Sequence, residues 1–391
     1  MKQAQNRNVV RLLLTFTIAG YCSGAVNLLG LELPNVDLIE DKRGVGMPFT
    51  HETPSALFGC NDDLVTEAHP CHHKNLKLTA THAGREQTQV PIYGILTQPY
   101  ESDELDTPDE YGQYAYVETP LNGTYIKMSH VKYLEQGGAR IVPVSYKLDA
   151  NQLNSLLSQL NGVYIPGDSA DVLTNERYLS SIKSILLWAQ SHNTDSHFPL
   201  IAVGYGYLGL MMQGIKSEYT IQAVPAERYF SNEQINLRLA PELTYTFDGY
   251  NLTQLEDLLN QVTFLHELIY SIPLDRFLGE SLLSSVFVPI ATIHEEKKDQ
   301  EGEFVAMVEG AHFPFFGSAL SLDKIQFNEE SGLGVDQSKA AVKLAQRIAN
   351  LFVDEARLSS NKFTQARDEY KAVIQNYDAK VVEGGAEMYL F

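Results

Sequence analysis

A strand-to-helix corner near the middle of the chain has the layout that many hydrolytic α/β enzymes use to present a nucleophile. The apolar run Leu200-Ile-Ala-Val203 leads into Gly204-Tyr-Gly-Tyr-Leu208 and then into a helix-forming stretch. This pattern is typical of a buried parallel strand that runs straight into a helix. Such a corner holds a Cys or Ser above the sheet, close to backbone N–H groups at the helix N-terminus. Here Gly204 takes that position, and glycine has no side chain that could attack a substrate.

The elements that must position this corner alternate along the chain. We expect strands over residues 91–98, 139–144, 162–167, 199–203, 286–293 and 304–308, and helices over residues 125–136, 152–160, 178–190 and 335–357. The alternation predicts an α/β fold with a doubly wound, mostly parallel sheet and helices on both faces. Function in such sheets collects at the carboxyl ends of the strands, where Gly167-Asp168 and Gly204-Tyr205 lie.

Composition is that of a soluble globular protein. The chain has 391 residues, of which 44% are hydrophobic and 20% charged, and no Pro tract or Gly/Ser tract suggests a linker. Its formal net charge of −20 would repel phosphates and therefore argues against binding to nucleic acid through bulk electrostatics. We interpret the charge as a solvated acidic surface, with an acidic partner-binding face as the alternative.

The N-terminus resembles a secretory signal peptide. Lys2, Arg7 and Arg11 precede the apolar run of residues 12–21, small residues follow the run, and no acidic residue appears before Glu32. The alternatives are an uncleaved anchor, which would attach the protein to a membrane, and a mitochondrial presequence. We expect the secretory pathway, with an extracellular, lysosomal, vacuolar or lumenal location. The expected divisions are a signal peptide or anchor (1–25), an irregular arm (26–90) and a compact domain (91–391).

The cysteines and glycosylation motifs agree with that pathway. Cleavage near residue 25 would remove Cys22 and leave an even pair, so we predict a Cys60–Cys71 disulfide. Asn122 and Asn251 begin Asn-x-Thr motifs, which are glycosylation acceptors in secreted proteins. The histidines around Cys71 match no structural zinc spacing, so we expect no metal site there and no cofactor.

Several ordered segments resemble the γ-glutamyl hydrolase family, which has the class I glutamine amidotransferase fold. Besides the corner, they are residues 91–98, 131–144, 161–171, 307–310 and 351–357. Members of that family cleave γ-linked glutamates from folate polyglutamates. The resemblance implies a Cys nucleophile at the corner, a His base, an acidic residue that orients the His, and backbone N–H donors for the oxyanion.

The sequence departs from the family pattern at each part of this machinery. The Gly-x-Cys-x-Gly corner becomes Ala-Val-Gly204-Tyr-Gly, which lacks the nucleophile. The His-Pro-Glu motif becomes Ser321-Leu-Asp323, which places serine where the base belongs. The Pro-Gly-Gly oxyanion loop becomes Pro-Gly167-Asp168, which places a carboxylate beside the position of developing negative charge. The resemblance therefore implies a member without a competent catalytic residue.

The rest of the expected pocket follows from the same resemblance. Tyr205 belongs to the oxyanion site by position, and Tyr207 flanks the corner. His266 matches a family Phe-His segment that touches the substrate, so we expect a vestigial pocket that includes His266 and Tyr207.

Three hypotheses follow for the function. The first is a non-catalytic homologue with a binding or assembly role, as a homodimer or with another protein partner. The second is an active γ-glutamyl peptidase whose nucleophile lies elsewhere, acting on folate polyglutamates or γ-glutamyl peptides. The third is a sensor of folates or other γ-glutamyl ligands.

Overall fold

The computed structural model describes residues 87–100, 123–215, 222–223, 231–296, 301–328, 334–381 and 386–391. All of them lie within one compact unit of the chain, Phe58–Phe391. The expected signal peptide, nearly all of the expected arm, Cys60, Cys71 and Asn122 lie outside the described residues. Among the residues described, no helix is long and apolar enough to cross a membrane.

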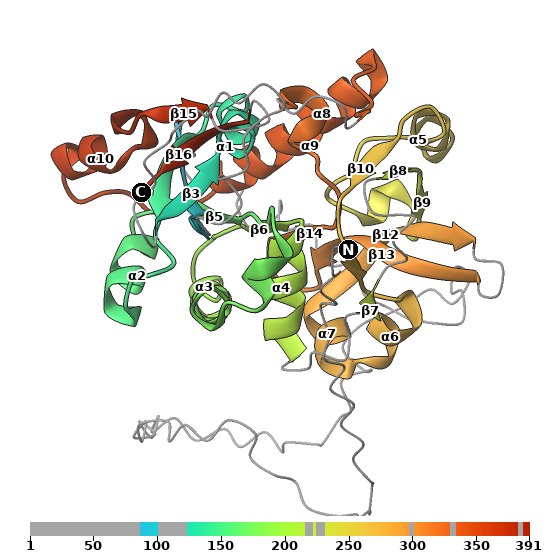
Figure 1. The fold of residues 1–391 in the computed structure, drawn as a ribbon, viewed down its shortest axis with the longest axis horizontal. Coiled ribbons are helices and arrows are strands. Elements are labelled where there is room, and N and C mark those ends of the chain that lie inside the picture. The colour runs from blue at the N-terminus through green and yellow to red at the C-terminus, as the bar shows by residue number, and fades with distance from the viewer. Residues whose placement is uncertain are drawn as a thin grey trace, which may run out of the picture. The chain divides into compact units, whose positions relative to one another are not determined.

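An eight-stranded sheet forms the centre of this unit, with the strand order β4-β1-β5-β6-β14-β13-β12-β9 (Figure 1). Its strands are β1 (Ile92–Leu96), β4 (Arg140–Val144), β5 (Gly162–Ile165), β6 (Leu200–Val203), β9 (Ile235–Leu237), β12 (Phe287–Glu296), β13 (Glu301–Gly310) and β14 (Phe315–Ser318). The strands from β4 to β14 run parallel, whereas β13, β12 and β9 continue the sheet antiparallel. The central parallel strands are buried along their whole length, which explains their unbroken apolar sequences.

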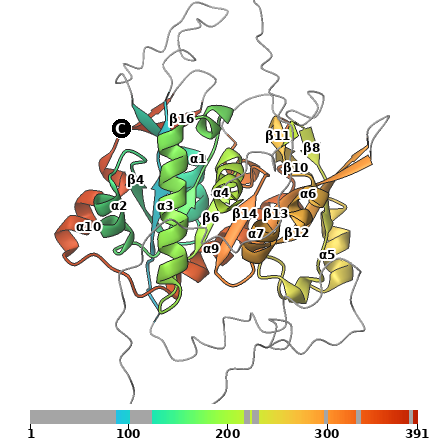
Figure 2. The same ribbon diagram turned by 90° about the horizontal axis from the view of Figure 1, so that it is seen from below.

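Helices cover both faces of the parallel half (Figure 2). One face carries α2 (Ala150–Leu157), α3 (Glu176–His192) and α4 (Tyr205–Ile215), and the other carries α1 (Met128–Glu135) and α9 (Lys339–Arg357). Alternate residues of one strand supply the two cores: Val163 and Ile165 of β5 pack with the first set of helices, and Tyr164 packs with the second. The expected fold class, a doubly wound and mostly parallel α/β sheet, is confirmed.

Two helices begin three or four residues later than the sequence predicts. Helix α9 begins at Lys339 because the Ser338 side chain caps it by accepting a hydrogen bond from the N–H of Ala341. Such a cap contributes about 1 kcal/mol. The expected helix over residues 125–136 was wrong at its start, since residues up to Lys127 form strand β3 and α1 begins only at Met128.

Strand β3 (Thr124–Lys127) lies in a second sheet of order β15-β16-β3-β2. Its neighbours are β2 (Gln98–Pro99) and the C-terminal strand β16 (Glu387–Leu390), which pairs with β15 (Ala379–Val381). The remaining strands are β7 (Gln222–Ala223), β8 (Ser231–Glu233), β10 (Phe264–His266) and β11 (Tyr270–Ser271). The remaining α-helices are α5 (Leu252–Leu259), α6 (Leu274–Gly279), α7 (Ser281–Val286), α8 (Lys324–Phe327) and α10 (Ala366–Ala372).

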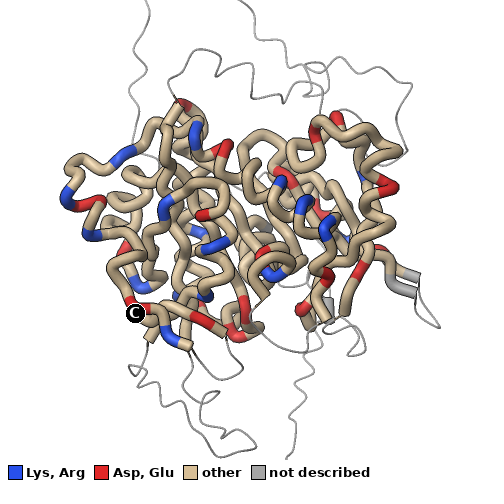
Figure 3. The backbone as a smooth tube through the Cα atoms, turned by 90° about the horizontal axis from the view of Figure 1, so that it is seen from above, with Lys and Arg blue, Asp and Glu red and all other residues tan. Residues whose placement is uncertain are grey.

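Acidic and basic residues are interspersed along the backbone of this unit (Figure 3). The described part of the chain therefore does not present the basic stripe that nucleic-acid-binding proteins use to follow a phosphate backbone.

Candidate functional site

The corner between β6 and α4 is built around Gly204. Its φ of +59° lies in the left-handed region that favours glycine. The Gly204 N–H donates to the carbonyl oxygen of Ser318 at 2.9 Å, which ties the corner to strand β14. A Cβ atom at Gly204 would lie 2.5 Å from the carbonyl oxygen of Gly167. Any side chain at this position would therefore require the loop after β5 to move.

The loop after β5 packs unusually closely against the start of α4. A Cβ at Gly206 would lie 2.5 Å from the carbonyl oxygens of Ile165 and Pro166, and one at Gly167 would lie 1.9 Å from the Gly206 nitrogen. Backbone meets backbone here, so no flexible side chain could give way. The glycines at 167 and 206 thus allow the contact that fixes the loop at the corner.

Of the three positions expected at the oxyanion site, Gly167, Asp168 and Tyr205, two have backbone N–H groups that already donate to acceptors of the chain. The Tyr205 N–H donates to the carbonyl oxygen of Gly167 at 2.9 Å. The Asp168 N–H donates to Oε1 of Gln98 at 2.7 Å. An oxyanion hole works only when its donors point at the place where negative charge develops. In this conformation a substrate oxygen would have to displace Gly167 and Gln98 to use these donors.

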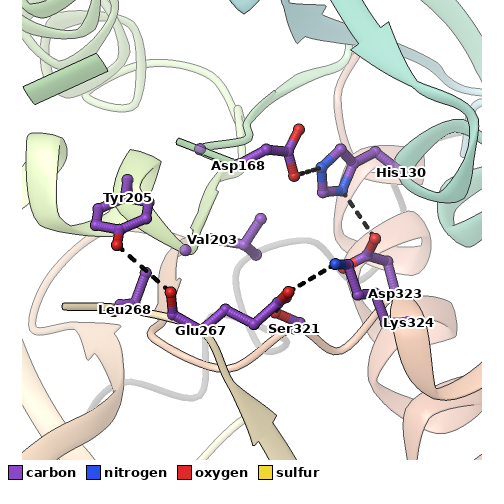
Figure 4. Close-up of a pocket in the computed structure, with 11 residues that line it drawn as sticks. His130, Asp168, Val203, Tyr205, Glu267, Leu268, Ser321, Asp323 and Lys324 are labelled. Atoms are coloured by element: carbon purple, nitrogen blue, oxygen red, sulfur yellow. Dashed lines mark hydrogen bonds and ion pairs between the residues drawn. The ribbon is translucent and has the colours of Figure 1, made fainter. Parts of the chain in front are cut away.

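A pocket opens beside this corner, at the carboxyl edge of the sheet (Figure 4). It is lined by His130, Gly167, Asp168, Val203, Gly204, Tyr205, Glu267, Leu268, Ser321, Asp323 and Lys324. The structure thus brings together six of the residues that the sequence singled out, namely Gly167, Asp168, Gly204, Tyr205, Ser321 and Asp323. The polar side chains that line the pocket form two networks, one centred on His130 and one on Glu267.

His130 of α1 lies between two carboxylates. Its Nε2 is 3.1 Å from Oδ1 of Asp168, and its Nδ1 is 3.3 Å from Oδ2 of Asp323. The Tyr164 hydroxyl is 3.2 Å from the same Nδ1. Burial opposes a charged imidazole, but the carboxylates of Asp323 and Asp168 outweigh it and raise the pKa of His130. His130 therefore bridges the two acids, and both acids favour its protonated form.

Asp168 faces His130, and its other neighbours are cationic or neutral donors. The Gln98 amide donates to its Oδ2 at 2.5 Å, and the Lys127 ammonium is 4.0 Å from its Oδ1. Burial alone would raise the pKa of Asp168, but Lys127 and His130 hold it well below its usual range. The carboxylate that the sequence placed beside the oxyanion site is thus an ionised partner of His130.

The second network surrounds Glu267, on the short link between β10 and β11. The Ser321 hydroxyl donates to Oε2 of Glu267 at 2.6 Å, and the Lys324 ammonium lies 2.7 Å from Oε1. Ser321 occupies the position where the resemblance expects a base, and here it acts as a donor to a carboxylate. Asp323, expected to orient that base, instead accepts a hydrogen bond from Ser129 at 2.6 Å and contacts His130.

Two residues expected in the vestigial pocket do not line it. Tyr207 is fully buried in the core, where it packs against Gly317 of β14, and burial raises the pKa of its hydroxyl. Its position in α4 turns its ring toward the sheet. His266 is buried in β10, which pairs with β8, and forms an isolated bridge with Leu320. The pocket residue on that segment is its neighbour Glu267.

His130, Glu267 and Lys324 were not singled out from the sequence as site residues. The only sequence signal at His130 is its helical spacing with Ile126, Tyr133 and Leu134, which predicts a histidine on the apolar face of a helix. Glu267 and Lys324 are adjacent to residues that the sequence did single out. Among the described residues, no group of three His, Cys, Asp or Glu side chains is arranged to hold a metal ion.

The amino-acid sequence of this chain is similar to those of several γ-glutamyl hydrolases. It is 26% identical to γ-glutamyl hydrolase B of Dictyostelium discoideum over 310 residues, which cover 78% of this chain and 81% of that protein. It is 27% identical to the γ-glutamyl hydrolase of Homo sapiens over 314 residues, covering 78% and 90% of the two chains. The enzyme of Glycine max is 28% identical over 334 residues, covering 82% and 90%. The chain is a homologue of the γ-glutamyl hydrolases.

The similarity to these hydrolases spans the region that holds the sheet and the pocket. No family model matches the chain. Among solved structures, a GMP synthase protein of Thermoplasma acidophilum is 12% identical, with a TM-score of 0.39 and coverage of 69% of this chain and 96% of that one. PurLQS of Thermotoga maritima is 10% identical, with a TM-score of 0.36 and coverage of 66% and 98%.

Proposed function

We propose that this γ-glutamyl hydrolase homologue is non-catalytic and has kept the fold for binding or assembly, as a homodimer or with another protein partner. The observation that carries the proposal is the corner at Gly204. A nucleophile is missing there, and the carbonyl oxygen of Gly167 lies 2.5 Å from the place where a Cβ would have to be. A substitution that merely removed a side chain would not by itself bring a neighbouring carbonyl this close.

The surroundings of the corner support the same proposal. The N–H groups of Tyr205 and Asp168 donate to Gly167 and Gln98, so two of the three expected oxyanion positions have engaged N–H groups. Ser321 cannot act as an imidazole does, and it donates to Glu267. Groups of one catalytic unit act together, and losing one member already removes most of its rate enhancement, on the order of 10⁴- to 10⁶-fold in serine proteases.

An active γ-glutamyl peptidase is the alternative, and it would need another nucleophile. The three cysteines of the chain, Cys22, Cys60 and Cys71, all precede β1, the first strand of the sheet. Within the described pocket, Ser321 and Tyr205 carry the hydroxyl groups. Ser321 donates to the Glu267 carboxylate, and Tyr205 receives a hydrogen bond from the N–H of Ile269 at 2.9 Å. Neither of these hydrogen bonds involves a histidine that could accept the hydroxyl proton.

A sensor of γ-glutamyl ligands is the second alternative, because the pocket persists without the nucleophile.

We further propose that the protein enters the secretory pathway. Asn251 is exposed, and its side chain caps α5 by accepting a hydrogen bond from the N–H of Thr253 at 3.0 Å. Its exposure leaves the Asn-x-Thr motif accessible to a glycan. Treatment of the secreted protein with a glycosidase tests this location. We expect the treatment to lower the mass of the wild type but not that of a variant that carries both Asn251→Gln and Asn122→Gln.

The non-catalytic proposal is tested by turnover of a γ-glutamyl folate conjugate. We expect the wild-type protein to release no glutamate above the buffer blank. A Gly204→Cys/Ser321→His double variant restores the two missing side chains, and Gly204→Cys alone serves as its matched control. We expect the double variant to remain inactive too, because the Gly167 carbonyl occupies the space beside the new side chain. Turnover by the wild type would reject the proposal.

Binding without turnover separates the two non-catalytic roles. Calorimetric titration of the wild type with the same conjugate would support the sensor if heat of binding appears at micromolar concentration. Absence of binding, together with a dimer in sedimentation, would support a role in assembly.

A further inference from the structure

A carboxylate of the chain itself fills part of the pocket. The Glu267 side chain extends from the link between β10 and β11 toward Ser321 and Lys324, as Figure 4 shows. Oε2 accepts from the Ser321 hydroxyl at 2.6 Å, and Oε1 lies 2.7 Å from the Lys324 ammonium. One donor is therefore matched to each carboxylate oxygen.

The two donors have the chemistry of a carboxylate receptor. A hydroxyl and an ammonium both donate, and hydrogen bonds between charged groups are shorter and stronger than neutral ones. The Lys324 side chain is only 7% exposed, so its positive charge is largely removed from water. A buried ammonium is costly to leave without an anion. These donors therefore retain a preference for a carboxylate, whichever molecule carries it.

The donors and their occupant belong to different parts of the fold. Lys324 begins helix α8, and Ser321 precedes it in the same segment after β14. Glu267 comes from a link that follows strand β10 and is held by Tyr205 of the corner. The Tyr205 hydroxyl donates to the carbonyl oxygen of Glu267 at 3.4 Å and accepts from the N–H of Ile269 at 2.9 Å. A shift of this link would withdraw the occupant and leave the donors in place.

We propose that Ser321 and Lys324 form a binding site for the carboxylate group of an organic acid, and that Glu267 occupies this site as an internal ligand. The site lies beside Gly167 and Gly204, so a bound acid would extend along the corner. The inference goes beyond the proposed non-catalytic function and does not depend on it, because carboxylate binding needs no nucleophile. It also gives Ser321 a role that a simple loss of the base would not.

Replacement of the internal ligand by acetate tests the site. In Glu267→Ala, the carboxylate is removed and Ser321 and Lys324 remain. We expect this variant to melt at a lower temperature than the wild type and to recover most of the difference in sodium acetate. Sodium chloride at equal ionic strength and the neutral isostere acetamide should not restore it. By calorimetry, the dissociation constant of acetate should be lower for the variant than for the wild type by a factor of about ten or more.

A Glu267→Ala/Lys324→Met double variant is the matched control, since it removes the ammonium and keeps the space. We expect acetate to have no effect on its melting temperature beyond that of chloride. If Glu267→Ala does not fold, recovery of a folded protein on refolding in acetate, in this variant or in Glu267→Ser, would still support the site. Failure of acetate to restore either variant, or an equal response of the double variant, would overturn the proposal.

Discussion

The two ends of strand β6 lie near buried histidines in different surroundings. Beyond its carboxyl end, His130 contacts two carboxylates, Asp168 and Asp323, and lines a pocket. Before its amino end, His197 contacts one carboxylate, Glu355 of α9, at 2.9 Å and has a fully buried side chain. The first histidine joins three segments that converge on the corner, whereas the second joins the strand entry to one helix. The polar network that lines a pocket thus lies at the edge where parallel sheets carry function.

Replacing each histidine with alanine measures how much its contacts contribute to the stability of the fold. His130→Ala removes the group that contacts both buried carboxylates, and we expect a loss of about 3–5 kcal/mol in the free energy of unfolding. His197→Ala leaves one carboxylate short of a hydrogen bond, with an expected loss of about 1–3 kcal/mol. Urea denaturation of both variants beside the wild type gives the two values. Equal losses would mean that the His130 network contributes no more to the free energy of unfolding than the His197–Glu355 contact does.

A methyl group at the corner tests the closeness of the Gly167 loop. Gly204→Ala adds a Cβ 2.5 Å from the Gly167 carbonyl at a φ of +59°, so we expect a loss of about 1–3 kcal/mol. Gly279→Ala in α6 is the matched control, because a Cβ there meets nothing within 4 Å. Alanine favours a helix over glycine by about 1 kcal/mol, so the control should be neutral or stabilised. If Gly204→Ala is as stable as the control, the Gly167 loop can move away from the new methyl group at no cost in stability.

The His130 network also predicts how stability changes with pH. Because folding raises the pKa of His130, its contribution is fully present below the pKa of the unfolded chain, about 6.5, and is lost as pH rises through the folded value. Asp168 has a lowered pKa, so its contribution is present above about 4 and is lost as pH falls. Melting temperature should therefore be higher near pH 5.5 than near pH 8.

Replacement of the imidazole isolates this effect. His130→Gln keeps a polar side chain without the titrating ring, and its melting temperature should change less between pH 5.5 and 8 than that of the wild type. Lys127, Asp168, Asp323 and Tyr164 all face this position and stay in the variant. A wild-type profile that rises toward pH 8, or an unchanged slope in the variant, would contradict a pKa of His130 that folding raises.

The sequence was sufficient for six strands of the eight-stranded sheet, because buried strands and amphipathic helices have local signatures, but it did not predict β9 and β14. It also placed Asp168 and Gly204 at the carboxyl edge, since each directly follows an expected strand. It could not locate His130 in the pocket, because α1 reaches the corner only through packing against the other face of the sheet. Nor could it show that β3 replaces the start of the expected helix, since the partner of Lys127 is Met388, more than two hundred residues later.

The pocket lining was harder to predict than the corner for a related reason. Tyr207 is two residues beyond Tyr205 in the same helix, yet its ring is part of the core while Tyr205 reaches the pocket. Neighbouring residues of a helix face different directions, and only the packing decides which of them borders a cavity. The same holds for His266 and Glu267, of which only the second lines the pocket.

Turnover with the wild-type protein in excess over substrate tests the central claim most directly. Under these conditions even a very slow hydrolase consumes the γ-glutamyl folate conjugate, and the released glutamate is measured by chromatography from pH 4 to 8. Because Gly204 offers no attacking atom and the oxyanion donors are engaged, we predict no product above the blank at any pH. Product that increases in proportion to the protein, and that is lost in a Ser321→Ala variant, would contradict the account.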